Sequence, residues 1–133
     1  MTYYNLAYAF QNRIAEPLYV RCNYDPAAEQ NDIELTTHAG QECDIVVEGE
    51  LMVQVGEHRE VLKAGDSIYF DSDKPHGMIA VGGKDCVFYA IVLNPTGEPI
   101  PEPLKNLGKK EILHSATIDK SEMKDAVSKF AKD

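Results

Sequence analysis

Two histidines and one glutamate, His38, Glu42 and His76, are the residues of this sequence best suited to chemistry. Imidazole nitrogens and carboxylate oxygens are ligands for divalent transition metals such as Fe, Zn, Ni, Cu and Mn. Three ligands of these types leave coordination positions open for water, a substrate or another small molecule. The residue types therefore predict a three-ligand metal site, provided that the fold brings residues 38 and 76 together.

The segments that carry these residues have the pattern of β-strands. In residues 32–38 the side chains alternate in character, which predicts a strand with Thr36 and His38 on one face. Gly40 follows, and a bend there would turn His38 and Glu42 toward one point. His76 comes directly after Pro75 and begins another predicted strand, so residues far apart in the sequence can meet.

Short β-patterns separated by glycine turns fill the body of the chain. Strands are predicted at 17–25, 32–38, 42–49, 50–56, 58–63, 67–73, 76–81 and 86–93, and a loop is predicted at 27–32. Gly49 and Gly56 stand where tight turns need a positive φ. This pattern predicts an all-β sandwich or closed barrel.

The two ends of the chain differ from this body. Residues 1–16 are rich in aromatics and are predicted to form an arm or a strand, ahead of a barrel at 17–93. Residues 94–118 form a proline-rich connector. Residues 119–133 are predicted to form a helix, the C-terminal appendage of the fold. Its apolar stripe consists of Met123, Ala126, Val127 and Phe130.

Length and composition exclude several classes of protein. The 133 residues suit one domain, and the net charge of −9 without a Lys or Arg cluster argues against a nucleic-acid partner. No apolar run is long enough to span a membrane, and the first residues do not read as a secretory signal. Three cysteines, Cys22, Cys43 and Cys86, without a CxxC motif predict reduced thiols in a cytoplasmic protein.

The spacing of ligands and glycines resembles the cupin superfamily. The first cupin motif is matched by His38, Glu42 and Gly49, and the second begins near Gly65 and ends at Pro75-His76. The resemblance covers roughly residues 17–93. It implies a double-stranded β-helix, or jelly-roll, barrel with a metal held by the three ligands. It also implies a homodimer in which the N-terminal strand joins the partner's sheet.

The sequence departs from the usual cupin pattern at two positions. Thr36 stands where the family usually has a further histidine, and Ala80 stands where it usually has an asparagine. The first departure leaves two alternatives open. One is a three-ligand site for one divalent metal such as Fe, Zn, Ni or Mn, and the other is a pocket that has lost its metal.

Two groups of cupins resemble this chain more specifically. The stretch GDSIYFDSDKPHGM is similar to the effector half of helix-turn-helix cupin regulators, and THAGQECDIVVEGE is similar to hydroxypropylphosphonate epoxidase. The chain has no helix-turn-helix of its own, so DNA binding does not carry over. Leu35 replaces an asparagine that the epoxidase has before its first ligand, which puts a phosphonate substrate in doubt.

Further residues are candidates for the pocket, and three functions remain open. The pocket candidates are Thr36, Asp44, Gln54 and Tyr8. We do not expect His58 or His114 to bind the metal. The first function is metal-dependent binding of a small organic molecule, for sensing, sequestering or carrying it. The second is a mononuclear non-haem metal enzyme, an oxygenase, isomerase or lyase, acting on a small organic acid. The third is a structural module with a vestigial pocket.

Overall fold

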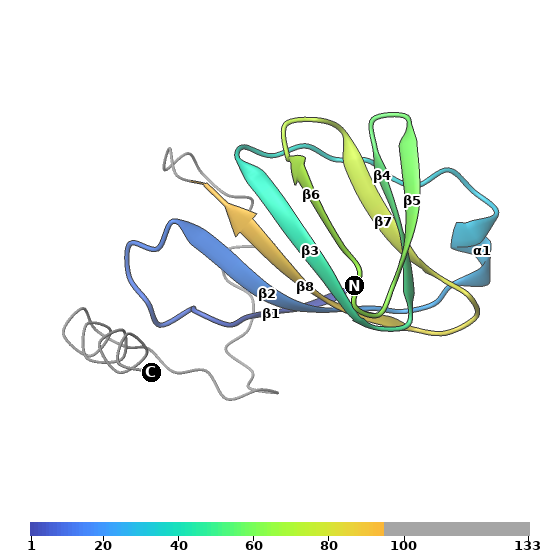
Figure 1. Ribbon diagram of the computed structural model, residues 1–133, viewed down its shortest axis with the longest axis horizontal. Helices are drawn as coiled ribbons and strands as arrows, with labels where there is room; N and C mark the ends of the chain where they lie inside the picture. Colours follow the sequence, from blue (N-terminus) through green and yellow to red (C-terminus); the bar gives the residue numbers. More distant parts are fainter. Residues whose placement is uncertain (95–133) are drawn as a thin grey trace, which may run out of the picture.

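A computed structural model describes residues 1–94 of the chain. It contains eight β-strands and one helical turn, α1 (Pro26–Glu29), as Figure 1 shows. The strands are β1 (Thr2–Asn5), β2 (Ala15–Cys22), β3 (Gln41–Glu48), β4 (Glu50–Val55), β5 (His58–Lys63), β6 (Ser67–Asp71), β7 (His76–Val81) and β8 (Cys86–Leu93). The prediction of an all-β fold is confirmed.

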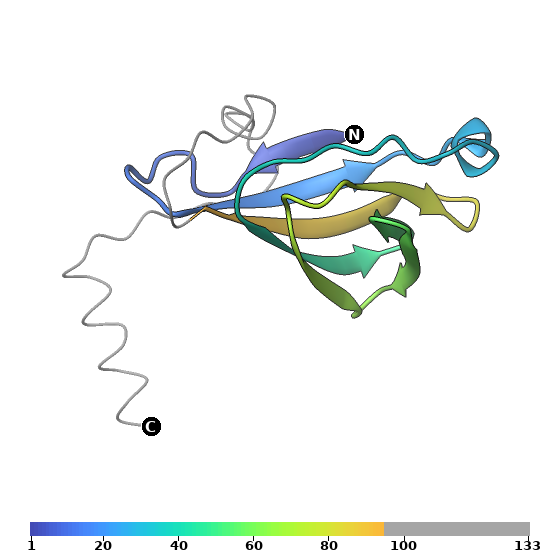
Figure 2. The same ribbon diagram turned by 90° about the horizontal axis from the view of Figure 1, so that it is seen from above.

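The strands form two antiparallel sheets. The larger sheet has the order β1-β2-β8-β3-β6, and the smaller has the order β5-β4-β7. Figure 2 shows the strands of both sheets from above. The arrangement is a jelly-roll sandwich, as the resemblance implied.

The core lies between the sheets because inward positions alternate with outward ones along each strand. Leu18 of β2 is paired with Ala90 of β8, and Val20 is paired with Phe88, so these four buried side chains share one face. Leu51 of β4, which is fully buried, contributes from the smaller sheet to the same hydrophobic cluster. Apolar packing therefore holds the layers together without help from the polar site.

Two predicted elements differ from the structure. Residues 32–38 do not form a strand, because only Thr36 pairs there, in an isolated bridge with His76. The loop predicted at 27–32 begins with the helical turn α1. The side chain of Asp25 accepts a hydrogen bond from the backbone N–H of Ala27, and proline stands in the first turn, where its missing N–H costs nothing.

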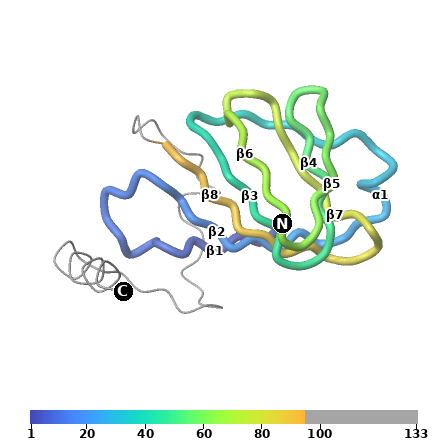
Figure 3. The backbone as a smooth tube through the Cα atoms, in the orientation of Figure 1, coloured from blue at the N-terminus to red at the C-terminus, as the bar shows by residue number. Residues whose placement is uncertain are grey.

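The segment ahead of β3 is nevertheless held firmly, because it runs beside the residues that precede β7. The N–H groups of Thr36 and His76 each donate to the other's carbonyl at 2.9 Å. The N–H of His38 donates to Ser72 O at 3.0 Å, and that of Ser72 donates to Gly40 O at 2.9 Å. Gly40 has φ +97°, and an added Cβ would lie 1.9 Å from Leu93 O, so the bend into β3 needs glycine. Figure 3 shows the segment between α1 and β3 passing the connection between β6 and β7.

The predictions for the two ends have different outcomes. The N-terminal arm is strand β1, which pairs with β2 from Thr2 to Asn5. The connector at 94–118, apart from Asn94, and the helix at 119–133 lie outside the described residues, as does His114. Within residues 1–94, no helix has the length and apolar character needed to cross a membrane.

Candidate metal centre

The structure brings His38, Glu42 and His76 together, with one ligand atom of each within 4.8 Å of the others. The Nε2 atom of His38 lies 3.3 Å from Oε1 of Glu42, and Nε2 of His76 lies 3.9 Å from the same oxygen. Two donors that bind one metal at about 2.1 Å each stand at most about 4.2 Å apart. Both separations therefore fit a shared ion.

Three different parts of the chain position these side chains. His38 lies in the segment ahead of β3, Glu42 lies on β3, and His76 is the first residue of β7. The rings of His38 and His76 meet edge to face with centroids 4.9 Å apart, and Phe70 of β6 packs against His76 at the same distance. Each imidazole is thus fixed by packing as well as by its backbone.

Backbone carbonyls orient both histidine rings. The Nδ1 atom of His38 is 3.2 Å from Ala39 O, and that of His76 is 2.8 Å from Lys74 O. These partners assign the proton of a neutral ring to Nδ1, which leaves the Nε2 lone pair toward Glu42. Two lone pairs would then face a carboxylate, an arrangement that needs a proton or a metal ion between them. Metal-binding histidines in proteins are held in this way.

The pKa shifts of His38 and Glu42 both favour a positive charge beside the Glu42 carboxylate. Burial alone would lower the pKa of His38, but its hydrogen bonds with Glu42 and with Ala39 O outweigh burial and raise that pKa. Burial would raise the pKa of Glu42, but its contacts with His38, Asp44 and His76 lower it instead. Glu42 is therefore an anion in the folded protein, as a metal ligand must be.

Asp44 is the next inward-facing residue of β3 after Glu42. It is fully buried, and neither of its carboxylate oxygens meets a hydrogen-bond donor in the described residues. Burial, followed by the charge of Glu42, raises its pKa well above the ordinary value. Both causes favour the neutral form of Asp44, and the nearby Asp44 side chain in turn helps to lower the pKa of Glu42.

A cavity of about 760 Å³ opens beside the three side chains. Half of its lining residues are apolar, and those that come from the two sheets are Leu18, Met78, Ile79, Phe88, Ala90 and Val92. This volume is typical of small-molecule sites, as is a wall that combines apolar side chains with polar groups. The cavity gives a small organic molecule access to the metal ligands.

The remaining predicted pocket residues lie in different places. Thr36 lines the cavity, and Asp44 does not. Gln54 lies on the face of β4 opposite the buried Leu51 and Val53, where it bonds to Gly56 O and accepts from Arg59. Tyr8 lies in the turn after β1 and is 39% exposed. The structure therefore does not bring Gln54 or Tyr8 to the cavity.

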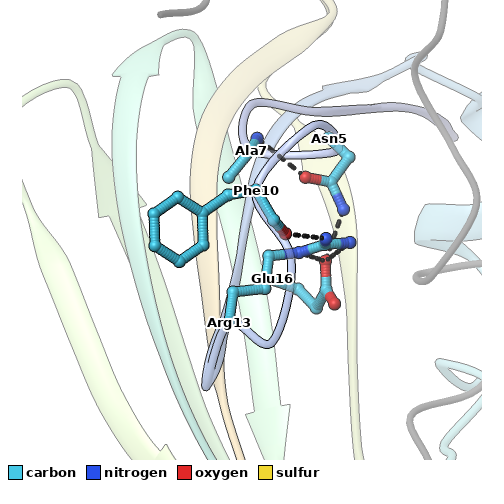
Figure 4. A network of polar contacts seen from close by, with 5 residues as sticks. All are labelled: Asn5, Ala7, Phe10, Arg13 and Glu16. Atoms are coloured by element: carbon cyan, nitrogen blue, oxygen red, sulfur yellow. Dashed lines mark hydrogen bonds and ion pairs between the residues drawn. The ribbon is translucent and has the colours of Figure 1, made fainter. Parts of the chain in front are cut away.

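Sequence reasoning did not single out Glu16, a buried carboxylate on the same inner face. Glu16 is paired with Val92 of β8, which is paired in turn with Glu42 of β3. Its carboxylate binds the guanidinium of Arg13 at 2.8 Å and accepts from Asn5 (Figure 4). A charge that is already neutralised in this way is not available to a metal, so Glu16 fastens the β1–β2 turn.

The chain is similar to several solved structures. The chain is 26% identical to iron(II) HppE in complex with substrate, with a TM-score of 0.53 over 60% of this chain and 46% of that one. It is 25% identical to hydroxypropylphosphonic acid epoxidase from S. wedmorenis in complex with fosfomycin, with a TM-score of 0.52 over 60% and 44%. An HTH_3 family transcriptional regulator from Vibrio cholerae is 27% identical, with a TM-score of 0.51 over 62% and 44%.

These relatives share the domain but are longer proteins, because the chain spans less than half of the length of each. No curated protein matches the sequence significantly. The family model described as a cupin domain matches residues 22–92, which is just over half of the chain. The chain belongs to the cupin family.

Proposed function

We propose that this protein is a metal-dependent binder of a small organic molecule, which it senses, sequesters or carries. His38, Glu42 and His76 hold one divalent transition metal, and the ligand reaches the open coordination positions from the cavity. The observation that carries the proposal is the orientation of the two rings, because both Nδ1 atoms are tied to carbonyls and both Nε2 atoms face Glu42. The cupin homologue HppE has been solved with iron(II) and with cobalt(II), which supports a metal from this group.

Binding is favoured over catalysis by the lining of the cavity. General acid or base catalysis needs a titratable group within reach of the substrate. Apart from the three ligands, the acidic residues among the described lining are Asp32 and Glu34, which are exposed at the rim. Asp44, the buried acid, lies outside the lining.

A metal enzyme is the second candidate, and the likeness to an iron epoxidase is the observation that favours it. Three protein ligands leave positions open where a metal supplies Lewis-acid or oxygen chemistry. Turnover of a small organic molecule by the metal-loaded protein, with product formed in excess of enzyme, would favour this candidate. The free thiols of Cys22, Cys43 and Cys86 support a reducing compartment such as the cytoplasm for either function.

The metal site is tested by loading the protein with Fe(II), Zn(II), Ni(II) or Mn(II), followed by elemental analysis and competition with a chelator. We expect about one equivalent of metal per chain, because residues 1–94 contain one cluster of potential metal ligands. Removing two ligands in Glu42→Ala/His76→Ala should abolish binding. Metal at about 100 times its dissociation constant should raise the free energy of unfolding by about 2.7 kcal/mol in the unaltered protein alone.

His58→Ala is the matched control. His58 also faces a carboxylate, Glu60 at 2.8 Å, but its side chain is 69% exposed on β5. We expect this variant to bind metal like the unaltered protein. A protein that takes up none of the four metals contradicts the proposal and favours the vestigial pocket. If the double variant unfolds, the metal is structural and the binding function is wrong.

A further inference from the structure

The charges around the cavity select among small molecules. Resting on the function proposed above, we propose that the ligand has a metal-binding group at one end, an apolar body, and a neutral or cationic group at the other end. Ligands whose far end carries a carboxylate, phosphonate or phosphate group are rejected. The juxtaposition that carries this inference is a cavity with an apolar wall on the two sheets and with carboxylates at its rim, where residues 1–94 place no lysine or arginine side chain.

The apolar body follows from the wall of the cavity. Leu18, Phe88 and Val92 form its inner part and are almost completely removed from solvent. Met78 and Ile79 of β7 line it on the other sheet. A ligand that fills this space gains from contact with hydrocarbon at about 25 cal/mol per Å² of apolar surface removed from water. A charged body would lose its hydration against this part of the wall, which offers it no polar partner.

The direction of the ligand follows from the segment ahead of β3. His38, Thr36, Glu34 and Asp32 are spaced two residues apart along this segment, and all four line the cavity. The segment lies against β7, since a Cβ on Gly77 would be 2.2 Å from Glu34 O. Four residues of extended chain span at most about 14 Å. A ligand bound near His38 therefore passes Thr36 and ends beside Glu34, within the length of a short aliphatic molecule.

The sign of the charge follows from the groups along that path. The carboxylates of Asp32 and Glu34 stand at the rim, and among residues 1–94 no lysine or arginine side chain lines the cavity. Arg59 approaches Asp32 at 4.0 Å from outside, and both side chains are exposed. The amino group of Met1 belongs to a residue that is 48% exposed, where solvent screens it.

Uncharged polar groups complete the lining. The hydroxyl-bearing residues Tyr3, Thr36 and Thr37 line the cavity. Burial, followed by the nearby Cys22, Glu42 and Asp44, raises the pKa of Tyr3, so its phenol stays neutral. These groups suit hydroxyl or ammonium functions on a ligand. An anionic group at the far end would meet two carboxylates, and the net charge of −9 adds to that repulsion.

The test uses three hydroxamic acids that share a metal-binding hydroxamate and a methylene spacer and end in an ammonium, a hydroxyl or a carboxylate group. Their binding to the Zn(II)-loaded full chain is measured by calorimetry at low and at high salt. We expect the carboxylate compound to bind at least about fivefold more weakly than the ammonium compound, with a smaller difference at high salt. The hydroxyl compound should lie between them.

Two charge reversals locate the effect. Glu34→Lys should bring the carboxylate compound level with the ammonium compound or ahead of it. Glu48→Lys makes the same change in net charge at the exposed far end of β3, and should leave the preference as it is in the unaltered protein. Equal responses to both variants would assign the preference to net charge alone and overturn the inference.

Uptake of Zn(II) alone, measured first, separates the two proposals. If the chain takes up no metal, the proposed function fails and this inference fails with it. If metal binds and the three compounds bind alike, or the carboxylate compound binds best, the inference is wrong while the metal site stands.

Discussion

At the scale of single residues, Glu42 and Asp44 are adjacent inward-facing carboxyl groups of β3 with different states. The lowered pKa of Glu42 and the raised pKa of Asp44 make one an anion and the other a neutral acid. A neutral Asp44 carries a proton that suits a hydrogen bond to the neighbouring carboxylate of Glu42. We therefore expect Asp44 to position Glu42 within the candidate metal site.

Replacement of Asp44 tests this role. Asp44→Asn keeps a donor for Glu42 and should retain a metal affinity within a few-fold of the unaltered protein. Asp44→Val has a similar shape and no donor, and should weaken metal binding by about 10- to 100-fold. Competition with a chelator measures both, and urea unfolding in the absence of metal checks that both variants fold. Equal affinities in the two variants would contradict a donor role for Asp44.

The residue types and their spacing predicted that His38, Glu42 and His76 lie close together, and the structure places them so; their role as metal ligands stays a prediction. The carbonyls of Ala39 and Lys74 that orient the rings could not be predicted, because every residue carries a carbonyl and only the fold selects two of them. Gln54 was a candidate because the sequence predicted a strand at this position without fixing which face of the strand points inward. Leu51 and Val53 point inward from β4, and Gln54, the next residue along the strand, points to the opposite face.

At the scale of elements, the segment ahead of β3 depends on Gly77 of β7. A Cβ on Gly77 would stand 2.2 Å from Glu34 O and 2.9 Å from Cγ2 of Ile33, so any side chain would push this segment away. The same segment carries Thr36, which pairs with His76. Glycine at position 77 therefore brings the segment of one ligand, His38, against the strand of another.

We expect Gly77→Ala to lower the free energy of unfolding by about 1–3 kcal/mol, because backbone must move to admit the methyl group. It should also weaken metal binding, because displacement of residues 33–36 loosens the pairing with His76. Gly65→Ala is the control. Gly65 has φ +93° and open space around its Cβ position, so it loses stability through strain and keeps the metal site. Unchanged metal affinity in Gly77→Ala would show that the close approach does not position the ligands.

The strands between residues 41 and 93 were predictable because glycine turns punctuate a strong alternation. The predicted strand at 32–38 was wrong for a physical reason. The alternating residues belong to an extended segment that lines the cavity. This segment forms one β-bridge with β7, between Thr36 and His76, and one bridge does not make a strand. The turn of helix at α1 was missed because one turn has no periodicity to detect.

At the scale of the whole molecule, β8 is apolar on both faces. Phe88 and Ala90 face the core, while Tyr89 and Ile91 alternate with them on the outer face of the larger sheet. The outer face continues across the sheet, where the ring centroids of Tyr19 and Tyr89 are 5.9 Å apart and those of Tyr4 and Tyr19 are 6.1 Å apart. A central strand of this composition is typical of a sheet that is covered on both sides.

The homodimer, which stays a prediction, would provide that cover. A stable interface removes about 800 Å² of surface from each partner, and aromatic side chains at its centre dominate the affinity. We expect light scattering to give twice the mass of one chain at micromolar concentration. Tyr19→Glu should weaken the dimer by about 30-fold or more.

Val61→Glu is the control for this prediction, because Val61 is 44% exposed on β5 of the other sheet. This variant places the same charge on a comparable apolar position that lies away from the outer face of the larger sheet, so its mass should equal that of the unaltered protein. If Val61→Glu dissociates the dimer and Tyr19→Glu does not, the interface lies on the smaller sheet. A single-chain mass at every concentration would show that the dimer prediction is wrong.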